Sequence, residues 1–278
     1  SIIEPTEIIV GKDSIDLEIK IFEGNQYTIN EVNISGNNRI NDEVIRREIY
    51  TQPGELYNRA LILQTISQLA MMRHFDETAI MPDMQPDGSD LVNISWPLTE
   101  KASDSFDISG GWGSGMFVGS IGITLSNLST RNLFKKDAWR PYPHGQSQQF
   151  SLSASTNGSY YSSFSIGFVE PWLGGKRPNS LSVNAFWSEQ TADYYNSFYG
   201  VIRSNQFFRA SGVSLGISRR LAWPDRYFSL YTGLGFSRYN LKDWPYFGNI
   251  FAENSGVSNI LYGSLRLSRN STDSQIYP

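Results

Sequence analysis

The sequence predicts an α+β module followed by an all-β region of about eight antiparallel strands. Helical periodicity is confined to the first third of the chain, and segments of alternating apolar and polar residues fill the remainder. Residues 1–104 hold 8 basic, 18 acidic and 6 aromatic side chains, whereas residues 105–278 hold 15, 9 and 32. We therefore place a composition boundary near Ser105 and assign residues 103–278 to the second domain.

The first third of the chain predicts alternating strands and helices. Ile15, Leu17 and Ile19 alternate with charged residues, as expected for a half-exposed strand that ends in a turn at 23–25. Asn58 is suited to cap a helix. From Tyr27 we expect strand, helix, helix, strand and strand, over residues 27–35, 42–50, 58 onward, 77–84 and 91–98.

Eight alternating segments follow, each with one apolar face and one face of small or polar residues. Asn157-Gly158 lies between two of them and is a strong hairpin signal, because both residues tolerate a positive φ. The first large apolar residues of the eight segments are Phe106, Phe117, Phe150, Phe164, Leu181, Val213, Phe228 and Leu261.

Two architectures use such strands: a soluble sandwich with the apolar face inside, and a transmembrane barrel with that face toward lipid. The barrel is favoured because several segments reach the about ten residues of a tilted crossing. Aromatic residues also gather at strand ends, and the opposite face is too small to fill a dry core. A secreted carbohydrate-binding sandwich remains the alternative from a different class.

Composition excludes several kinds of chemistry. The chain has no cysteine and only two histidines, His74 and His144, so we expect no metal site, no cofactor and no enzymatic activity. A formal charge of −4 gives no basic field for nucleic acid. No apolar run approaches the about 20 residues that a membrane-spanning helix needs.

The first domain carries six short motifs: Phe22-Glu23-Gly24, Tyr27-Thr28-Ile29, Ile34-Ser35-Gly36-Asn37, Pro53-Gly54, Tyr57-Asn58 and Phe75-Asp76. Together these motifs resemble the POTRA repeat, the polypeptide-transport-associated module of the outer-membrane insertase superfamily. On this resemblance residues 25–102 form a POTRA domain, and residues 1–24 are the end of a preceding repeat.

The second domain carries Asn127-Leu128, a turn at 170–175 and a closing segment at 268–273. These segments resemble the first half of the barrel of the BamA-like outer-membrane assembly factors, and we call residues 170–175 the family-like turn. The resemblance implies about eight strands of a 16-stranded barrel in the bacterial outer membrane, with the POTRA domain in the periplasm. Such factors fold and insert other outer-membrane proteins without covalent chemistry. The implied partners are unfolded client proteins, accessory lipoproteins or other subunits, and outer-membrane lipids.

The chain departs from the family pattern in two respects. It has neither the Arg-Gly-Phe loop motif nor the aromatic-ended final strand of the second half of such barrels. The inward residues Ser120, Gly122, Thr124 and Ser126 are too small to fill an eight-stranded barrel, so we expect further strands to be needed for closure. The connection at 129–146 is also unusually long, and strand alternation places it on the periplasmic side. A TamA-like or two-partner secretion pore is the alternative within the superfamily.

Four sets of candidate functional residues follow. The first barrel strand is expected to form one side of a lateral gate, unless its glycines serve only the following hairpin. A POTRA edge strand is expected to pair with clients, and the basic loop either contacts anionic headgroups or a partner, or is simply solvated. The carboxylate of the family-like turn is read as either an ion-pair partner or a strand-end group. The sets are Phe106, Ile108, Gly110, Gly111 and Trp112 for the gate; Glu77, Ala79 and Met81 for the edge; Arg131, Lys135, Lys136 and Arg140 for the loop; and Glu170, Pro171, Trp172, Gly174 and Gly175 for the turn.

Overall fold

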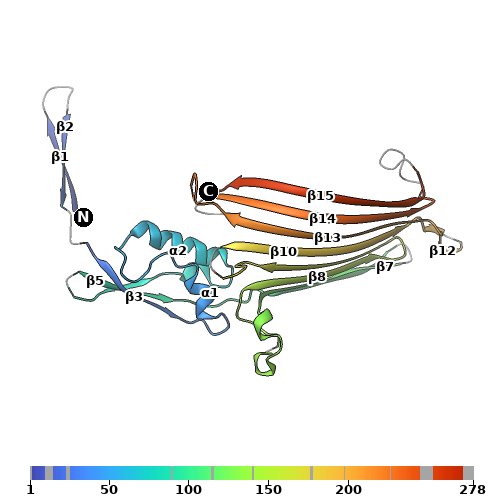
Figure 1. The fold of residues 1–278 in the computed structure, drawn as a ribbon, viewed down its shortest axis with the longest axis horizontal. Coiled ribbons are helices and arrows are strands. Elements are labelled where there is room, and N and C mark those ends of the chain that lie inside the picture. Colours follow the sequence, from blue (N-terminus) through green and yellow to red (C-terminus); the bar gives the residue numbers. More distant parts are fainter. Residues whose placement is uncertain are drawn as a thin grey trace. The chain divides into compact units, whose positions relative to one another are not determined.

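The computed structural model describes residues 2–9, 15–22, 26–88, 90–113, 116–139, 141–175, 178–196, 198–225, 227–244 and 253–271. The chain divides into two compact units, Ser1–Asn37 with Ile45–Lys101, and Asn38–Val44 with Ala102–Pro278. Figure 1 shows the elements of both. No helix in the described part of the chain is long and apolar enough to cross a membrane.

The first unit contains an N-terminal hairpin and a small mixed sheet. Strands β1 (Ile2–Ile9) and β2 (Ile15–Phe22) pair antiparallel along their whole length. The sheet has the order β3-β5-β4, with β3 parallel and β4 antiparallel to the central strand β5. The predicted order of strand, helix, helix, strand and strand is confirmed. The elements are β3 (Thr28–Ser35), α1 (Asp42–Arg46), α2 (Arg59–Met71), β4 (Asp83–Pro86) and β5 (Leu91–Pro97). The first three residues of α1 are grouped with the second unit.

The helix α2 begins where the sequence predicts. The Asn58 side chain accepts a hydrogen bond from Ala60 N–H (2.9 Å), which satisfies one of the free donors of the first turn. Ile62 and Leu69 are buried on the inward face. The core of this unit also contains Ile29, Val32, Ile45, Ile49, Phe75, Ile80, Val92, Ile94, Trp96 and Leu98.

The predicted strand over 77–84 is wrong in its first half. Glu77–Ala79 form a short 3₁₀ helix, η1, because Asp76 Oδ1 accepts a hydrogen bond from Thr78 N–H (3.0 Å) and stabilises a turn. Met81 lies in the connection after η1 and is 76% exposed. The edge strand of the sheet is β4, which begins only at Asp83.

The second unit is built on one eight-stranded antiparallel sheet in the order β15-β14-β13-β10-β9-β8-β7-β6. All eight predicted strands are confirmed. A short hairpin of β11 (Tyr194–Asn196) and β12 (Gly200–Ile202) was not expected from the sequence. The eight strands are β6 (Ser105–Gly113), β7 (Met116–Leu128), β8 (Gln148–Asn157), β9 (Tyr161–Glu170), β10 (Asn179–Thr191), β13 (Phe207–Arg220), β14 (Phe228–Lys242) and β15 (Gly256–Arg269).

Among the residues that the structure describes, no second sheet covers the apolar face of this sheet. Leu215 pairs across the strands with Val183 and Leu234, and Leu215 and Leu234 are 51% and 65% exposed. A sandwich would bury these side chains, so the sandwich alternative is wrong. Further exposed apolar residues of the same face are Phe106, Ile108, Phe117, Ile121, Phe164, Ile166, Trp187, Val213, Ile217, Phe236, Leu261 and Leu265.

The sheet is open in the described part of the chain. β6 and β15 are the two ends of the strand order and do not pair with each other. The expectation that these eight strands do not close a barrel by themselves is therefore consistent with the observed topology. We call the end of the sheet at which β6 begins its base, and the opposite end its rim.

Candidate functional site

The predicted gate strand β6 lies at an edge of the sheet. It pairs with β7 at nine successive positions, from Ser105↔Thr124 to Gly113↔Met116. Its apolar side chains Phe106, Ile108 and Trp112 are 63%, 66% and 76% exposed. The other side of β6 faces no strand among the described residues, so its outward backbone groups are available to a further strand.

The two glycines of β6 have different surroundings. A Cβ at Gly110 would lie 3.3 Å from Phe117 Cζ, so this glycine makes room for a ring on the apolar face. Nothing lies within 4 Å of the Cβ position of Gly111. The opposite, polar face carries a hydrogen bond between the Ser109 and Ser120 hydroxyls (2.7 Å).

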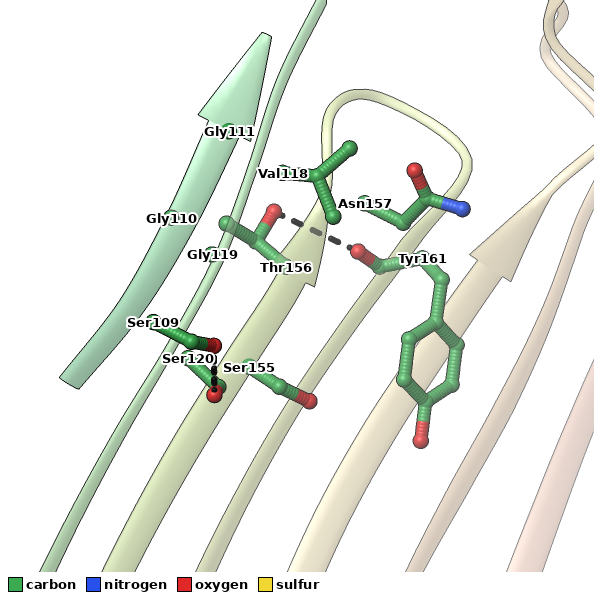
Figure 2. A pocket seen from close by; sticks show the side chains of 10 residues that line it. All are labelled: Ser109, Gly110, Gly111, Val118, Gly119, Ser120, Ser155, Thr156, Asn157 and Tyr161. Atoms are coloured by element: carbon green, nitrogen blue, oxygen red, sulfur yellow. Dashed lines mark hydrogen bonds between the residues drawn. The ribbon is translucent and has the colours of Figure 1, made fainter. Parts of the chain in front are cut away.

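An open depression of about 490 Å³ occupies this part of the sheet near the rim (Figure 2). Small and hydroxyl side chains of four neighbouring strands line it, so it presents donors and acceptors without a deep enclosure. The lining residues are Ser109, Gly110, Gly111, Val118, Gly119, Ser120, Ser155, Thr156, Asn157 and Tyr161.

At the base, a carboxylate just before β6 gathers several donors. Asp104 accepts hydrogen bonds from Ser126 N–H (2.9 Å), the Ser126 hydroxyl (3.1 Å) and the Tyr142 hydroxyl (2.6 Å). Arg39 Nη2 lies 3.5 Å from Asp104 Oδ2. This one side chain therefore ties the start of β6, the end of β7 and the long connection after it together.

The pKa values of the Asp104 carboxyl and the Tyr142 phenol reflect this arrangement. Burial opposes the charge on Asp104, but the hydrogen bonds from Tyr142 and Ser126 and the charge of Arg39 outweigh it and hold the pKa of the carboxyl below its ordinary value of 3.8. Burial and the carboxylate of Asp104 raise the pKa of the Tyr142 phenol well above its ordinary value of 10.0. At neutral pH the pair is therefore a carboxylate and a neutral phenol.

Asn127 holds the long connection from the other side. Its buried Oδ1 accepts hydrogen bonds from Gly145 N–H (3.1 Å) and Ser147 N–H (3.0 Å), and its Nδ2 donates to Arg39 O (2.9 Å). Asn41 N–H donates to Gly145 O (3.0 Å). Residues 38–44, which belong to the second unit, are thus fixed to the connection by backbone and side-chain hydrogen bonds.

The predicted basic loop lies at the base of the sheet, between β7 and β8. Lys135 and Lys136 are exposed, and Arg131 Nη1 lies 3.5 Å from Glu43 Oε2. Arg140 lies outside the described residues. Two short 3₁₀ turns, η2 (Thr130–Asn132) and η3 (Lys136–Ala138), shape the loop.

Glu170 in the family-like turn acts as a hydrogen-bond acceptor. Its Oε1 accepts from Trp172 N–H (3.0 Å) and its Oε2 accepts from the buried Gln148 Nε2 (2.5 Å). No ion pair of Glu170 is found among the described residues, which favours the strand-end interpretation. Pro171 starts the turn, and Gly174 and Gly175 have φ of +80° and +71°, which glycine adopts at no steric cost.

The edge of the POTRA-like sheet is short and exposed. All four residues of β4 are exposed. Asp87 N–H donates to Leu91 O (2.9 Å), and positions alternate along an antiparallel pair. Gln85 therefore directs its N–H to β5, whereas the N–H of Met84 points away from the sheet. Pro86, which has no N–H, occupies the next outward position.

Sequence reasoning did not single out the polar residues that organise the base. In the sequence Asn127 belongs only to a motif of the family resemblance, and no sequence pattern marks Asp104, Tyr142 or Gln148 as functional. A polar residue interrupting an apolar strand end is a weak signal, because its partners here are up to 88 positions away in sequence.

Two sequence families match the chain. Residues 27–100 match the POTRA family, described as surface antigen variable number repeat, and residues 144–278 match the Omp85 superfamily domain. The chain is thus similar to the Omp85 superfamily over residues 144–278 and to the POTRA family over residues 27–100. Both matches agree with the order of the POTRA-like unit and the barrel-like sheet in this chain.

Curated relatives and solved structures point the same way. The outer membrane protein assembly factor BamA of Neisseria meningitidis serogroup B is 26% identical over 161 residues, which are 58% of this chain and 18% of that protein. BamA of Neorickettsia risticii is 30% identical over 115 residues, 41% of this chain and 15% of that protein. The matched parts span less than a fifth of these relatives.

The fold of this chain is also found in a crystal structure. BamA from Haemophilus ducreyi lacking POTRA domains 1–3 matches 99% of this chain and 50% of that chain, with a TM-score of 0.57 and 17% sequence identity. At this identity the likeness shows the fold alone.

Proposed function

We propose that this chain is a POTRA repeat and the first half of the barrel of an outer-membrane protein assembly factor. In this proposal the sheet crosses the bacterial outer membrane and the POTRA repeat lies in the periplasm. The observation that carries it is the exposed apolar face of a single open sheet, in a chain whose preceding residues match the POTRA family, since lipid is the solvent that such a face suits. Sixteen strands, eight beyond those seen here, would close the barrel.

The proposed mechanism is templating at a lateral gate along β6. In a closed barrel the first strand pairs with the last, and each ladder bond resists opening. Gly110 and Gly111 give the rim half of β6 low strand propensity. Opening this seam exposes backbone groups in the bilayer, where each unpaired group costs several kcal/mol. A client strand that pairs with β6 removes that cost, so insertion needs no catalysis and no cofactor.

The POTRA repeat supplies a second pairing edge in this proposal. The outward N–H of Met84 and the exposure of all of β4 support it, because edge pairing uses backbone groups and tolerates many client sequences. The corresponding partners are unfolded outer-membrane proteins and accessory subunits of an assembly complex.

A disulfide across the gate tests the proposal. The full-length protein carrying this chain is reconstituted in liposomes with Ile108→Cys and a cysteine on the final barrel strand, and the folded fraction of an added denatured client barrel is measured by heat modifiability. We expect oxidation to block client folding and reduction to restore it. Normal folding of the client while the seam is fully crosslinked would contradict a lateral gate along β6.

A matched control uses a seam that is not the gate. Ser109 and Ser120 lie opposite each other on β6 and β7, so Ser109→Cys with Ser120→Cys crosslinks an already paired seam. We expect this disulfide to leave client folding unchanged.

The translocation pore of the same superfamily is favoured instead if a secreted passenger enters the liposomes while no client barrel folds.

A further inference from the structure

The β7–β8 connection exposes apolar side chains at the base of the sheet. Phe134 is 97% exposed, Trp139 52% and Leu133 39%. Clustered apolar exposure of this kind is typical of an interaction surface rather than of a solvated loop. We call residues Leu133–Trp139 the aromatic–basic loop.

The backbone around the aromatic–basic loop is held in place. Ser129 N–H donates a hydrogen bond to Pro143 O (2.8 Å). At the start of the connection, Gln148 Oε1 accepts a hydrogen bond from Thr130 N–H (2.7 Å). Trp139 Nε1 donates to Leu133 O (3.0 Å), so the polar edge of the indole is satisfied within the loop. The backbone that carries Phe134 is therefore held by hydrogen bonds. Trp139 can enter an apolar medium without leaving its indole N–H unpaired.

Positive charge accompanies these apolar residues. Lys135 and Lys136 directly follow Phe134, both are exposed, and neither forms an ion pair within the described parts of the chain. Asp137 is the single acidic residue between 129 and 147, against Arg131, Lys135, Lys136 and Arg140. The partner that complements the aromatic–basic loop is therefore an apolar layer whose surface carries negative charge.

The level of the loop along the strands points to a bilayer surface. β8 and β9 have ten residues each, which is about the length that crosses a hydrocarbon core. Their ends, and the connection that enters β8, therefore lie at headgroup level. In Figure 1 the green segment between β7 and β8 leaves the sheet at the ends of these strands and extends to one side, roughly across the strand direction.

Other connections at the same end show the same character. Leu173 after β9 is 42% exposed, and Trp223 and Tyr227 between β13 and β14 are 82% and 50% exposed. A lipid surface contacts all three connections at once, whereas a protein partner would cover one of them. This repetition favours a membrane over a protein as the occupant.

We propose that the aromatic–basic loop binds anionic phospholipid in the leaflet at the base of the sheet. Phe134 and Trp139 enter the boundary between headgroups and acyl chains, and Lys135 and Lys136 pair with headgroup phosphates. The inference rests on the proposed membrane location and adds a lipid preference to it.

Retained lipid measures this preference. The full-length protein is extracted from bilayers of equimolar phosphatidylethanolamine and phosphatidylglycerol, and bound lipids are counted by native mass spectrometry. We expect Lys135→Ala with Lys136→Ala to lower retained phosphatidylglycerol by roughly five-fold for each lysine, since a basic residue near an anionic surface contributes about 1 kcal/mol. The matched control is Arg203→Ala with Lys242→Ala near the rim, which removes the same charge and should change nothing. Equal retention by wild type and the lysine variant overturns the proposal.

Photo-crosslinking identifies the occupant in cells. With Phe134→p-benzoylphenylalanine in the full-length protein, we expect an adduct with phospholipid, and an adduct only with a protein overturns the proposal. Client folding is scored separately on the same preparations. If wild type and the lysine variant retain equal lipid and client folding is normal, only the lipid site is contradicted. If lipid retention depends on the lysines but no client folds, only the proposed function is contradicted.

Discussion

The Tyr142 hydroxyl donates a 2.6 Å hydrogen bond to Asp104 Oδ2, joining the middle of the β7–β8 connection to the residue before β6. The carboxylate is ionised at neutral pH because its hydrogen bonds lower its pKa. The contact thus links the proposed gate strand to the loop at the base, through groups that lie outside the strands.

The first prediction is that Tyr142→Phe destabilises the second unit at neutral pH by roughly 1–2 kcal/mol, the range of a hydrogen bond to a partly exposed charged group. Because the folded-state pKa of Asp104 is lowered, its stabilisation is present above its ordinary pKa of 3.8 and is lost as the pH falls through the folded value. Denaturant titrations of the full-length protein in micelles should show that the difference in unfolding free energy between wild type and Tyr142→Phe becomes smaller at acidic pH. A difference that does not change with pH would contradict this account.

The second prediction concerns Asn127. Asn127→Ala removes the acceptor of Ser147 N–H and the donor to Arg39 O, and we expect a loss of about 2 kcal/mol in unfolding free energy with faster proteolysis between 129 and 147. Asn132→Ala is the control, since that side chain is only half-buried and makes one longer bond, 3.3 Å to His144 O. Equal effects of both variants would argue against a special role for Asn127.

The third prediction separates pairing capacity from stability on β4. Met84→Pro removes an outward N–H, so we expect weaker co-purification of partners with little change in the melting temperature of the protein. Gln85→Pro removes a donor to β5 and should destabilise the sheet by about 3 kcal/mol or more. Unchanged partner binding by a folded Met84→Pro variant would exclude β4 as the binding edge.

The fourth prediction uses two glycines with nearly the same positive φ. Gly36 and Gly54 have φ of +85° and +87°, but a Cβ at Gly36 would lie 1.9 Å from Leu98 O, and nothing lies within 4 Å at Gly54. Gly54→Ala should cost about 1 kcal/mol from backbone strain alone. Gly36→Ala should cost at least about 3 kcal/mol, because the obstacle is backbone. Thermal unfolding of both variants measures the difference, and equal melting temperatures would show that the contact relaxes.

The sequence alone determined the strands of the second unit and most elements of the first. Alternation with period two is a local property, so it could be read directly, as could the cap that Asn58 provides to α2. The expected strand at Glu77 failed because a hydrogen bond from Thr78 N–H to Asp76 favours a turn, and alternation does not register this competition.

The tertiary structure decided what each face and edge is used for. Alternation is the same in a sandwich and a barrel, and only the pairing of eight strands into one uncovered sheet separates them. Asn127 and Arg39 are 88 positions apart, and their hydrogen bond depends on the chain returning to the end of β7. Such partners are brought together by the global fold, so local sequence patterns carry no record of them.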